Sequence, residues 1–280
     1  MPILNVKFPD QWPGWSIKEC NLAGVAHSDM EKLSKYGGEQ DIVSVSVDPR
    51  AITDYYSDSP VFRGTLSRRH PMSKAPTLIM KFAMREDFIE DLAQEASMYA
   101  GPLKTLQGTT IPESYGLYVG TLDDGQCVAC LLLECWGDVI RKPFSQLPMQ
   151  TRVRILERLG EIHKQGFLHG DFAERNVLQK NGDIRLIDFD QVVPDHHCNC
   201  DMDFRPGEPL PDQKNFGCRH LWEVCRNEMR IWSEYSFPRL VGERYLTLLR
   251  IRDEKTGKIK NTNNQSKRPT FVLDNAYPVS

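Results

Sequence analysis

The chain has 280 residues, a formal net charge of −3 and a sequence pI near 6.2. This length is enough to bury a sizeable core and to form a two-lobed domain. The nearly balanced charge creates no overall field that would attract nucleic acid or an anionic membrane, so neither is expected as a partner.

The sequence also indicates a cellular compartment. It opens without a charged segment followed by an apolar core, and none of its apolar runs approaches the length of a membrane span. Eight cysteines, several within expected strands or helices, are typical of reduced thiols rather than of a secreted disulfide framework. We therefore expect a cytoplasmic or nuclear protein.

The first 134 residues predict an extension followed by a small lobe. Residues 1–38 contain Trp12 and Trp15 and then a short polar helix, and we expect this N-terminal extension to pack on a lobe formed by residues 39–134. Apolar patterning within that lobe predicts strands at 42–47, 61–66, 77–83 and 126–133.

Lys81 lies inside the apolar run at 77–83. An ammonium group is costly to bury unless it has a partner. Residues 86–105 place apolar side chains at helical spacing, and Glu95 lies on or beside that stripe. We therefore expect an ion pair between Lys81 and Glu95. A solvated lysine on an edge strand and an exposed glutamate are the alternative.

A second helix is predicted at about 148–165, with Val153, Leu156 and Leu159 on its apolar face. His163 shares this face, and we interpret it as a packed helix residue rather than a catalyst. The helix delivers the chain to the segment with the most informative side chains.

That segment runs from His169 to Asn176 and is followed by Asp188-Phe189-Asp190. Asp171 can take a proton from a hydroxyl group, and the side-chain oxygens of Asn176 and Asp188 are of the kind that hold Mg²⁺. Residues 177–187 predict a strand, an Asn-Gly turn and a strand, so a hairpin would bring Asp188 beside Asn176. The alternative is that these residues merely cap turns in a loop.

This run resembles the catalytic loop and metal-binding turn of the protein kinase-like superfamily. The phrases Leu-His-Gly-Asp and Leu-Ile-Asp-Phe-Asp look closest to a fungal kinase-like group, and the loop also resembles those of aminoglycoside and choline phosphotransferases and of compact atypical protein kinases. The resemblance implies an α+β, two-lobed fold with a small antiparallel-sheet N-lobe. It also implies a truncated, mainly helical C-lobe at 135–252.

The resemblance assigns catalytic roles to individual residues. It implies that Asp171 is the catalytic base and that Asn176 and Asp188 bind Mg²⁺. It further implies that Lys81 holds the phosphates of ATP and is itself held by Glu95. These are the roles on which the predicted chemistry depends.

Four further roles follow from the same resemblance. Arg175 would neutralise charge that develops on the transferred group. The strand at 126–133 resembles the one that leads to the kinase hinge, so adenine would pair with backbone groups of Glu134 and Trp136. Leu133 would then lie at the back of the nucleotide pocket.

The sequence departs from the family at two places. No glycine-rich loop of the usual spacing precedes Lys81, although Ser57, Ser59 and nearby amides could cover phosphate. Gly170 replaces the arginine that commonly receives an activation-loop phosphate. Residues 192–212 contain no Ser, Thr or Tyr, so control by phosphorylation of that segment is not expected.

Two short runs rich in cysteine and histidine follow, at 196–200 and 218–220. They could form a zinc clip. Because the Cys198-Asn199-Cys200 run lacks the two-residue gap usual in zinc knuckles, we interpret these runs as a loop of free thiols and imidazoles.

The overall prediction is an ATP- and Mg²⁺-dependent phosphotransferase, a protein kinase that acts on Ser/Thr hydroxyls. Its partners would be a nucleotide and a protein or small-molecule hydroxyl acceptor. A small-molecule kinase of the aminoglycoside or choline type and a pseudokinase binding module are the alternatives. Residues 253–280 are polar and aperiodic and predict a flexible C-terminal tail.

Overall fold

The structure is a computed structural model, and it describes residues 2–10, 16–25, 42–52, 59–67 and 76–233. The chain divides into two compact units, of which the first, Met1–Glu234, holds all of these residues. The predicted tail, Trp12, Trp15 and Ser57 lie outside the described residues.

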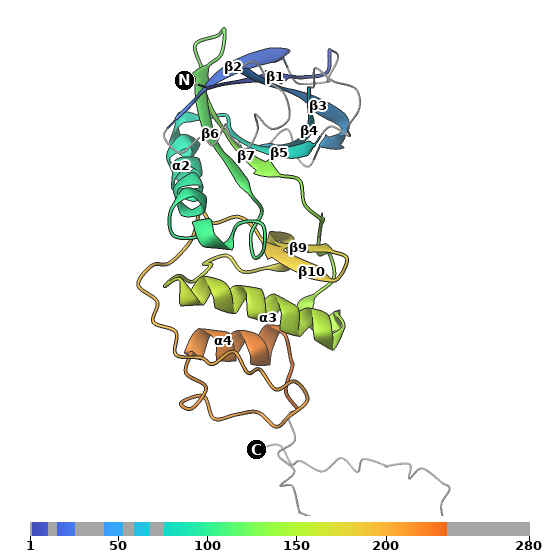
Figure 1. Cartoon of the computed structure of the whole chain (residues 1–280), viewed down its shortest axis with the longest axis vertical. Coiled ribbons are helices and arrows are strands. Elements are labelled where there is room, and N and C mark those ends of the chain that lie inside the picture. Colours follow the sequence, from blue (N-terminus) through green and yellow to red (C-terminus); the bar gives the residue numbers. More distant parts are fainter. Residues whose placement is uncertain (1, 11–15, 26–41, 53–58, 68–75, 234–280) are drawn as a thin grey trace, which may run out of the picture. The chain divides into compact units, whose positions relative to one another are not determined.

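Seven strands form a closed barrel in the first half of the chain (Figure 1). Around the barrel the order is β1-β2-β6-β7-β5-β4-β3. The strands are β1 Ile3–Lys7, β2 Glu19–Gly24, β3 Ile42–Ile52, β4 Val61–Leu66, β5 Thr77–Ala83, β6 Ser114–Thr121 and β7 Cys127–Glu134.

The closed barrel, which includes one parallel pair, corrects the prediction of a small antiparallel-sheet N-lobe. β1 pairs in parallel with β3, with Ile3 opposite Ile42, while its other neighbour β2 is antiparallel. β1 and β2 come from the segment that was expected to be an extension, and they bridge β6 and β3. The boundary predicted near residue 38 stays a prediction, but strands before it pair directly with strands after it.

Side chains alternate between the two faces of each strand, and those on the inner face fill the barrel. In β5, Leu78, Met80 and Phe82 point into the barrel core, whereas Lys81 lies on the opposite face. Phe82 and Phe62 pack edge-to-face inside, with ring centroids 5.7 Å apart. Side chains therefore close the interior, as expected for a small barrel, and the site must lie outside it.

A second core joins the outer face of the barrel to the helices. Helix α2, Glu86–Ala100, packs against β5, β6 and β7, and its buried side includes Leu92 and Tyr99. Helix α3, Met149–Lys164, contributes Leu156 and Leu159 to the same core. The two helices predicted from apolar periodicity are thus confirmed within a few residues of their expected ends.

The remaining elements are short. They are β8 Asp138–Val139, β9 Val177–Lys180, β10 Asp183–Leu186, α4 Arg219–Glu223, the 3-10 turns η1 Lys104–Leu106, η2 Phe144–Gln146 and η3 Glu174–Asn176, and the π-helical turn η4 Val224–Glu228.

The predicted hairpin after Asn176 is formed by β9 and β10. Asn181 and Gly182 make its turn with φ of 52° and 83°, the left-handed conformation that these residue types adopt readily. Residues 187–218, between β10 and α4, contain neither helix nor strand.

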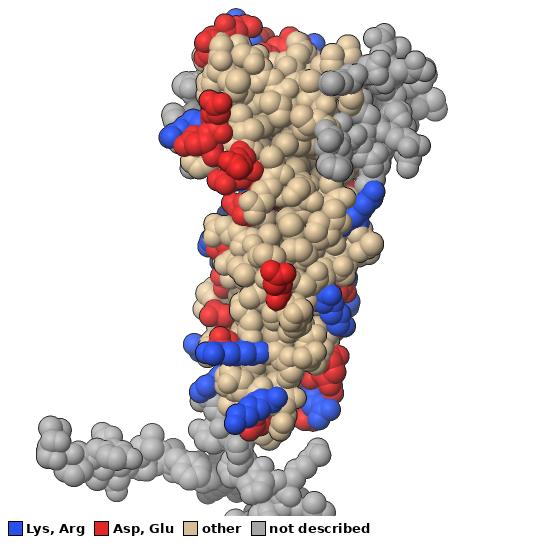
Figure 2. All heavy atoms as spheres, turned by 90° about the vertical axis from the view of Figure 1, so that its left-hand side faces the viewer, with Lys and Arg blue, Asp and Glu red and all other residues tan. Residues whose placement is uncertain are grey.

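Charge on the surface is uneven. The exposed residues of α2 include Glu86, Asp87, Glu90 and Asp91. Figure 2 views the side on which α2 lies in Figure 1, and acidic side chains gather over the upper part of that face. Within the described part of the chain, no helix combines the length and apolar character needed to cross a membrane.

Candidate active site

Lys81 joins the barrel, α2 and the turn after β10. Its Nζ donates to Glu95 Oε2 at 2.8 Å and also to Asp188 Oδ1. The Glu95 side chain is 1% exposed, so the acid that the helical stripe placed beside Lys81 is fully inside the core. The ion pair predicted between Lys81 and Glu95 is therefore formed, and Asp188 is a second partner that sequence reasoning did not predict.

These contacts keep Lys81 charged. Burial alone would lower the pKa of its ammonium group, but the adjacent carboxylates of Glu95 and Asp188 outweigh that effect and raise the pKa above its ordinary value. A permanently charged ammonium is suited to holding phosphate oxygens.

Asp188 is held in an unusual backbone conformation. Its φ is 74°, a region that costs energy for a residue with a side chain and that clusters at functional sites. The turn is fixed on both sides, because Ile187 N–H donates to the Asn176 carbonyl at 3.0 Å and Phe189 packs edge-to-face on Tyr99 at 5.4 Å. The fold therefore aims the Asp188 carboxylate at Lys81.

The loop that carries Asp171 is tied to the same turn. His169 is fully buried, and its Nε2 lies 3.0 Å from the Ile187 carbonyl oxygen. Burial lowers the pKa of His169, so the ring is neutral, and Nε2 must carry the proton because a carbonyl can only accept. This hydrogen bond links the two halves of the predicted motif.

Asp171 has two side-chain partners. Asn176 Nδ2 donates to the Asp171 carbonyl at 2.8 Å and to its Oδ2 at 3.0 Å. Arg175 Nη2 contacts Asp171 Oδ1 at 2.5 Å and Oδ2 at 2.6 Å. Because the amide nitrogen of Asn176 faces Asp171, its amide oxygen is the atom left for a cation. The structure thus brings Asp171, Asn176 and Arg175 together.

Asp190 is a residue of this region that sequence reasoning did not single out. Its Oδ1 is buried and has no hydrogen-bond partner among the described residues. Burial, followed by the negative charge of Asp188, raises the pKa of Asp190. Its position two residues after Asp188 was visible in the sequence, but its burial was not.

The composition of the site fits a divalent cation and phosphates. Four carboxylates and two cations meet here: Glu95, Asp171, Asp188, Asp190, Lys81 and Arg175. Carboxylates therefore outnumber cations, and one buried carboxylate oxygen has no partner in the described chain. Hard oxygen ligands in excess over positive charge are what Mg²⁺ requires.

The predicted hinge residues have a structural environment that the sequence did not reveal. Leu133 and Trp136 are buried, and the Glu134 carboxylate pairs with Arg185 Nη1 at 2.5 Å. Arg185 also donates to the Gly108 carbonyl at 2.6 Å and lies 4.3 Å from the centre of the Trp136 ring. Arg185 thus ties the end of β7 to β10.

The backbone of Glu134 is partly used as well. Its N–H donates to the Glu113 carbonyl at 2.9 Å, so the predicted contact with adenine would need the carbonyl oxygen of Glu134. The adenine-binding roles of Leu133, Glu134 and Trp136 stay predictions.

Comparisons with known proteins point to one superfamily. The RIO domain matches residues 146–205, which include the Asp171 loop, β9, β10 and Asp188. The chain is 32% identical over 74 residues to the RIO-type serine/threonine-protein kinase Rio2 of Methanocaldococcus jannaschii, a match that covers 26% of this chain and 23% of the relative. These findings show that this part of the chain is similar to members of the protein kinase-like superfamily.

Two further relatives match parts of the chain. The KEOPS complex subunit Bud32 of Pyrococcus abyssi is 28% identical over 57 residues, covering 19% of this chain and 26% of the relative. The pseudokinase OPG198 of Monkeypox virus is 27% identical over 108 residues, covering 39% and 36%. The chain therefore spans between 23% and 36% of the length of these relatives. Over the matched parts of the chain, the comparisons support a kinase-like function.

The contacts of Lys81 lead to a prediction about coupling. Lys81→Met and Glu95→Gln should each reduce ATP turnover by roughly 10-fold or more, because each removes a charge that positions the other. The double variant should lose less than the product of the two effects, with a coupling free energy of at least about 0.5 kcal/mol. Steady-state kinetics of the four proteins measures this.

Asp87→Asn serves as the control for this cycle. Asp87 pairs with Arg85 on the exposed first turn of α2 at 2.6 Å, and an exposed pair contributes little. Turnover by this variant should match the wild type. Strictly multiplicative losses for Lys81 and Glu95 would contradict the functional pair.

Proposed function

We propose that the chain is an ATP- and Mg²⁺-dependent phosphotransferase that acts as a protein kinase on serine or threonine hydroxyls. The observation that carries the proposal is the joint contact of Lys81 with Glu95 and Asp188. The Lys81 ammonium group thereby links strand β5, helix α2 and the turn after β10. Similarity to a RIO-type serine/threonine kinase supports the class of acceptor.

Each residue of the site has a role in this proposal. When bound, Mg-ATP supplies a phosphoryl group that can be transferred to an acceptor oxygen. The Asp188 carboxylate and the Asn176 amide oxygen would hold the cation, and Lys81 would hold phosphate oxygens. Asp171 would orient the acceptor hydroxyl and take its proton.

Arg175 must change partner for this chemistry to proceed. Its guanidinium contacts both oxygens of the Asp171 carboxylate, yet the Arg175 side chain is 65% exposed. An exposed arginine can leave Asp171 at little cost because surface ion pairs are weak. It would then be free to neutralise charge on the transferred group, which is the role proposed for it.

A pseudokinase is the second candidate function. Two observations favour it: the similarity to the pseudokinase OPG198, and the Arg175 contact that occupies both oxygens of Asp171. In that case the chain would bind nucleotide, or a protein partner, without transfer.

Two linked measurements separate these functions. A thermal shift with ATP should require Mg²⁺ if the carboxylates hold a cation. Transfer of labelled γ-phosphate should then be measured to a protein acceptor panel and, in parallel, to cationic alcohols and aminoglycosides. Transfer to protein hydroxyls is the expected result. A shift without transfer would indicate a pseudokinase, and transfer to small molecules would overturn the protein-kinase assignment.

A further inference from the structure

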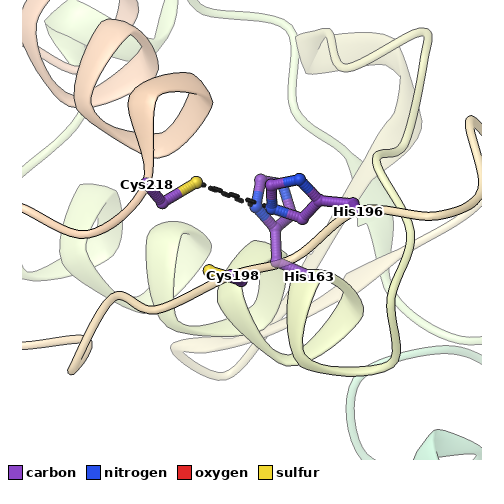
Figure 3. A group of neighbouring side chains, drawn as sticks. All are labelled: His163, His196, Cys198 and Cys218. Atoms are coloured by element: carbon purple, nitrogen blue, oxygen red, sulfur yellow. Dashed lines mark hydrogen bonds between the residues drawn. The ribbon is translucent and has the colours of Figure 1, made fainter.

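A cluster of two imidazoles and two thiols lies outside the candidate active site (Figure 3). Its members are His163, His196, Cys198 and Cys218. One nitrogen or sulfur atom from each of the four lies within 4.8 Å of all the others. We propose that this cluster is a structural zinc site.

The spacing within the cluster fits tetrahedral zinc. Cys218 Sγ lies 3.6 Å from His163 Nδ1 and 3.6 Å from His196 Nε2. With Zn–S bonds of about 2.3 Å and Zn–N bonds of about 2.0 Å, the sulfur-to-nitrogen edge of a tetrahedron is roughly 3.5 Å. Both of these sulfur-to-nitrogen separations therefore match the edge that one zinc ion would impose, and the other ligand atoms lie within 4.8 Å of one another.

The charges also fit. Two thiolates and two neutral imidazoles neutralise a divalent ion, so the complex adds no net charge to a largely buried site. Binding would release one proton from each thiol. A tetrahedral set of two sulfur and two nitrogen ligands is typical of zinc, and four protein ligands leave no open position for a substrate. The site is therefore structural rather than catalytic.

His163, the most deeply buried imidazole of the cluster, has few hydrogen-bond partners. His163 is 1% exposed, its Nε2 has no partner within the described chain, and its Nδ1 has only the long contact with Cys218. Buried imidazole nitrogens in a core are normally hydrogen-bonded. The ring instead lies against a second imidazole, that of His196, with centroids 4.6 Å apart. Coordination of a cation through Nδ1 explains why thiols and a second imidazole surround this nitrogen, and Nε2 would then carry the proton of the ring.

Figure 3 shows that the ligands come from separate segments. His163 is in the last turns of α3, His196 and Cys198 lie on the irregular segment after β10, and Cys218 caps α4 by accepting from Leu221 N–H. Residues 187–218 have no helix or strand to order them, and long irregular segments of that kind are uncommon in compact domains. A zinc ion would cross-link this segment to both helices.

The segment that zinc would anchor also supports the candidate active site. Leu168 and Val193 exchange two backbone hydrogen bonds of 2.9 Å, and His196 N–H donates to the Gly166 carbonyl at 2.9 Å. The anchored residues therefore begin directly after Asp190 and lie against the backbone that leads to Asp171. This assignment replaces the interpretation of the cluster as free thiols and imidazoles.

Metal analysis of the full chain tests the proposal. The protein should be produced without a histidine tag, in zinc-supplemented medium and under reducing conditions, and its zinc measured by mass spectrometry. The expected content is about one zinc ion per chain. Cys198→Ser and His196→Gln should lose most of this zinc, whereas Cys200→Ser should retain it. Cys200 is the matched control because it is a buried thiol two residues from Cys198 and outside the cluster.

A spectroscopic measurement on wild-type protein tests the proposal even if the variants fail to fold. Wild-type protein stripped of metal and loaded with Co²⁺ should show the visible bands of a tetrahedral site and sulfur-to-cobalt charge transfer. Absence of stoichiometric zinc together with absence of these bands would overturn the proposal. Retention of zinc by Cys198→Ser or loss of zinc by Cys200→Ser would also overturn it. So would a disulfide between Cys198 and Cys218 that persists when the protein is purified under reducing conditions.

Discussion

Asp188→Asn is expected to reduce Mg²⁺-dependent ATP turnover by on the order of 100-fold or more. A carboxylate supplies a full negative charge to a divalent cation, and an amide cannot replace it. The substitution also removes one of the two acids at Lys81, so the phosphate-holding ammonium loses a positioning contact. Turnover as a function of Mg²⁺ concentration measures the effect.

The fold of this variant should survive. Asn is one of the few residues that adopts positive φ readily, so the 74° value at position 188 is compatible with it. Asp195→Asn is the matched control, since Asp195 is exposed and has a φ of 60°. Both variants should keep the wild-type melting temperature. Undiminished Mg²⁺-dependent turnover by Asp188→Asn would remove Asp188 from the metal site.

Gly170→Ala is expected to destabilise the protein by about 3 kcal/mol or more, with a fall in melting temperature of roughly 6–12 °C. Gly170 has a φ of 76°, and a Cβ built there overlaps the carbonyl oxygen of Gln191. That carbonyl cannot easily move away, because the backbone N–H and carbonyl of Val193, two residues later, are both hydrogen-bonded to Leu168. Denaturant unfolding gives the change in the free energy of unfolding.

Gly125→Ala is the control that shows the effect of a positive φ alone, without a close approach to another residue. Gly125 has a φ of 87°, but nothing lies within 4 Å of a Cβ added there. This variant should lower the free energy of unfolding by only about 1–2 kcal/mol, the cost of the left-handed conformation for a residue with a side chain. Equal losses for the two variants would contradict the close approach at Gly170. The overlap also means that an arginine at position 170 would require Gln191 to move.

The features that could be predicted from the sequence have local signals. The apolar run around Lys81 and the helical stripe beside Glu95 each bury one face, and the ion pair that is formed gives each of the two charges a partner. The Asn181-Gly182 turn fixes the register of β9 and β10, which places Asp188 beside the Asp171 loop.

The features that could not be predicted depend on pairings between distant segments. β1 is a five-residue strand whose partner β3 begins at Ile42, and nothing in either segment specifies parallel pairing. Arg185 contacts Glu134 and Trp136, which are about 50 residues away in the sequence, and no local pattern indicates these contacts. The clip of imidazoles and thiols was judged on the spacing at 196–200, whereas His163 joins it from a helix earlier in the chain.

The central claim is that Asp171 acts with Lys81, Asn176 and Asp188 to transfer a phosphoryl group. The most direct test compares wild type and Asp171→Asn for nucleotide affinity and for transfer of labelled γ-phosphate to the same acceptor. We predict that affinity for Mg-ATP is unchanged within about 3-fold, while transfer falls by on the order of 100-fold or more. Equal transfer by the two proteins, or wild-type binding without transfer to any acceptor, would contradict the claim.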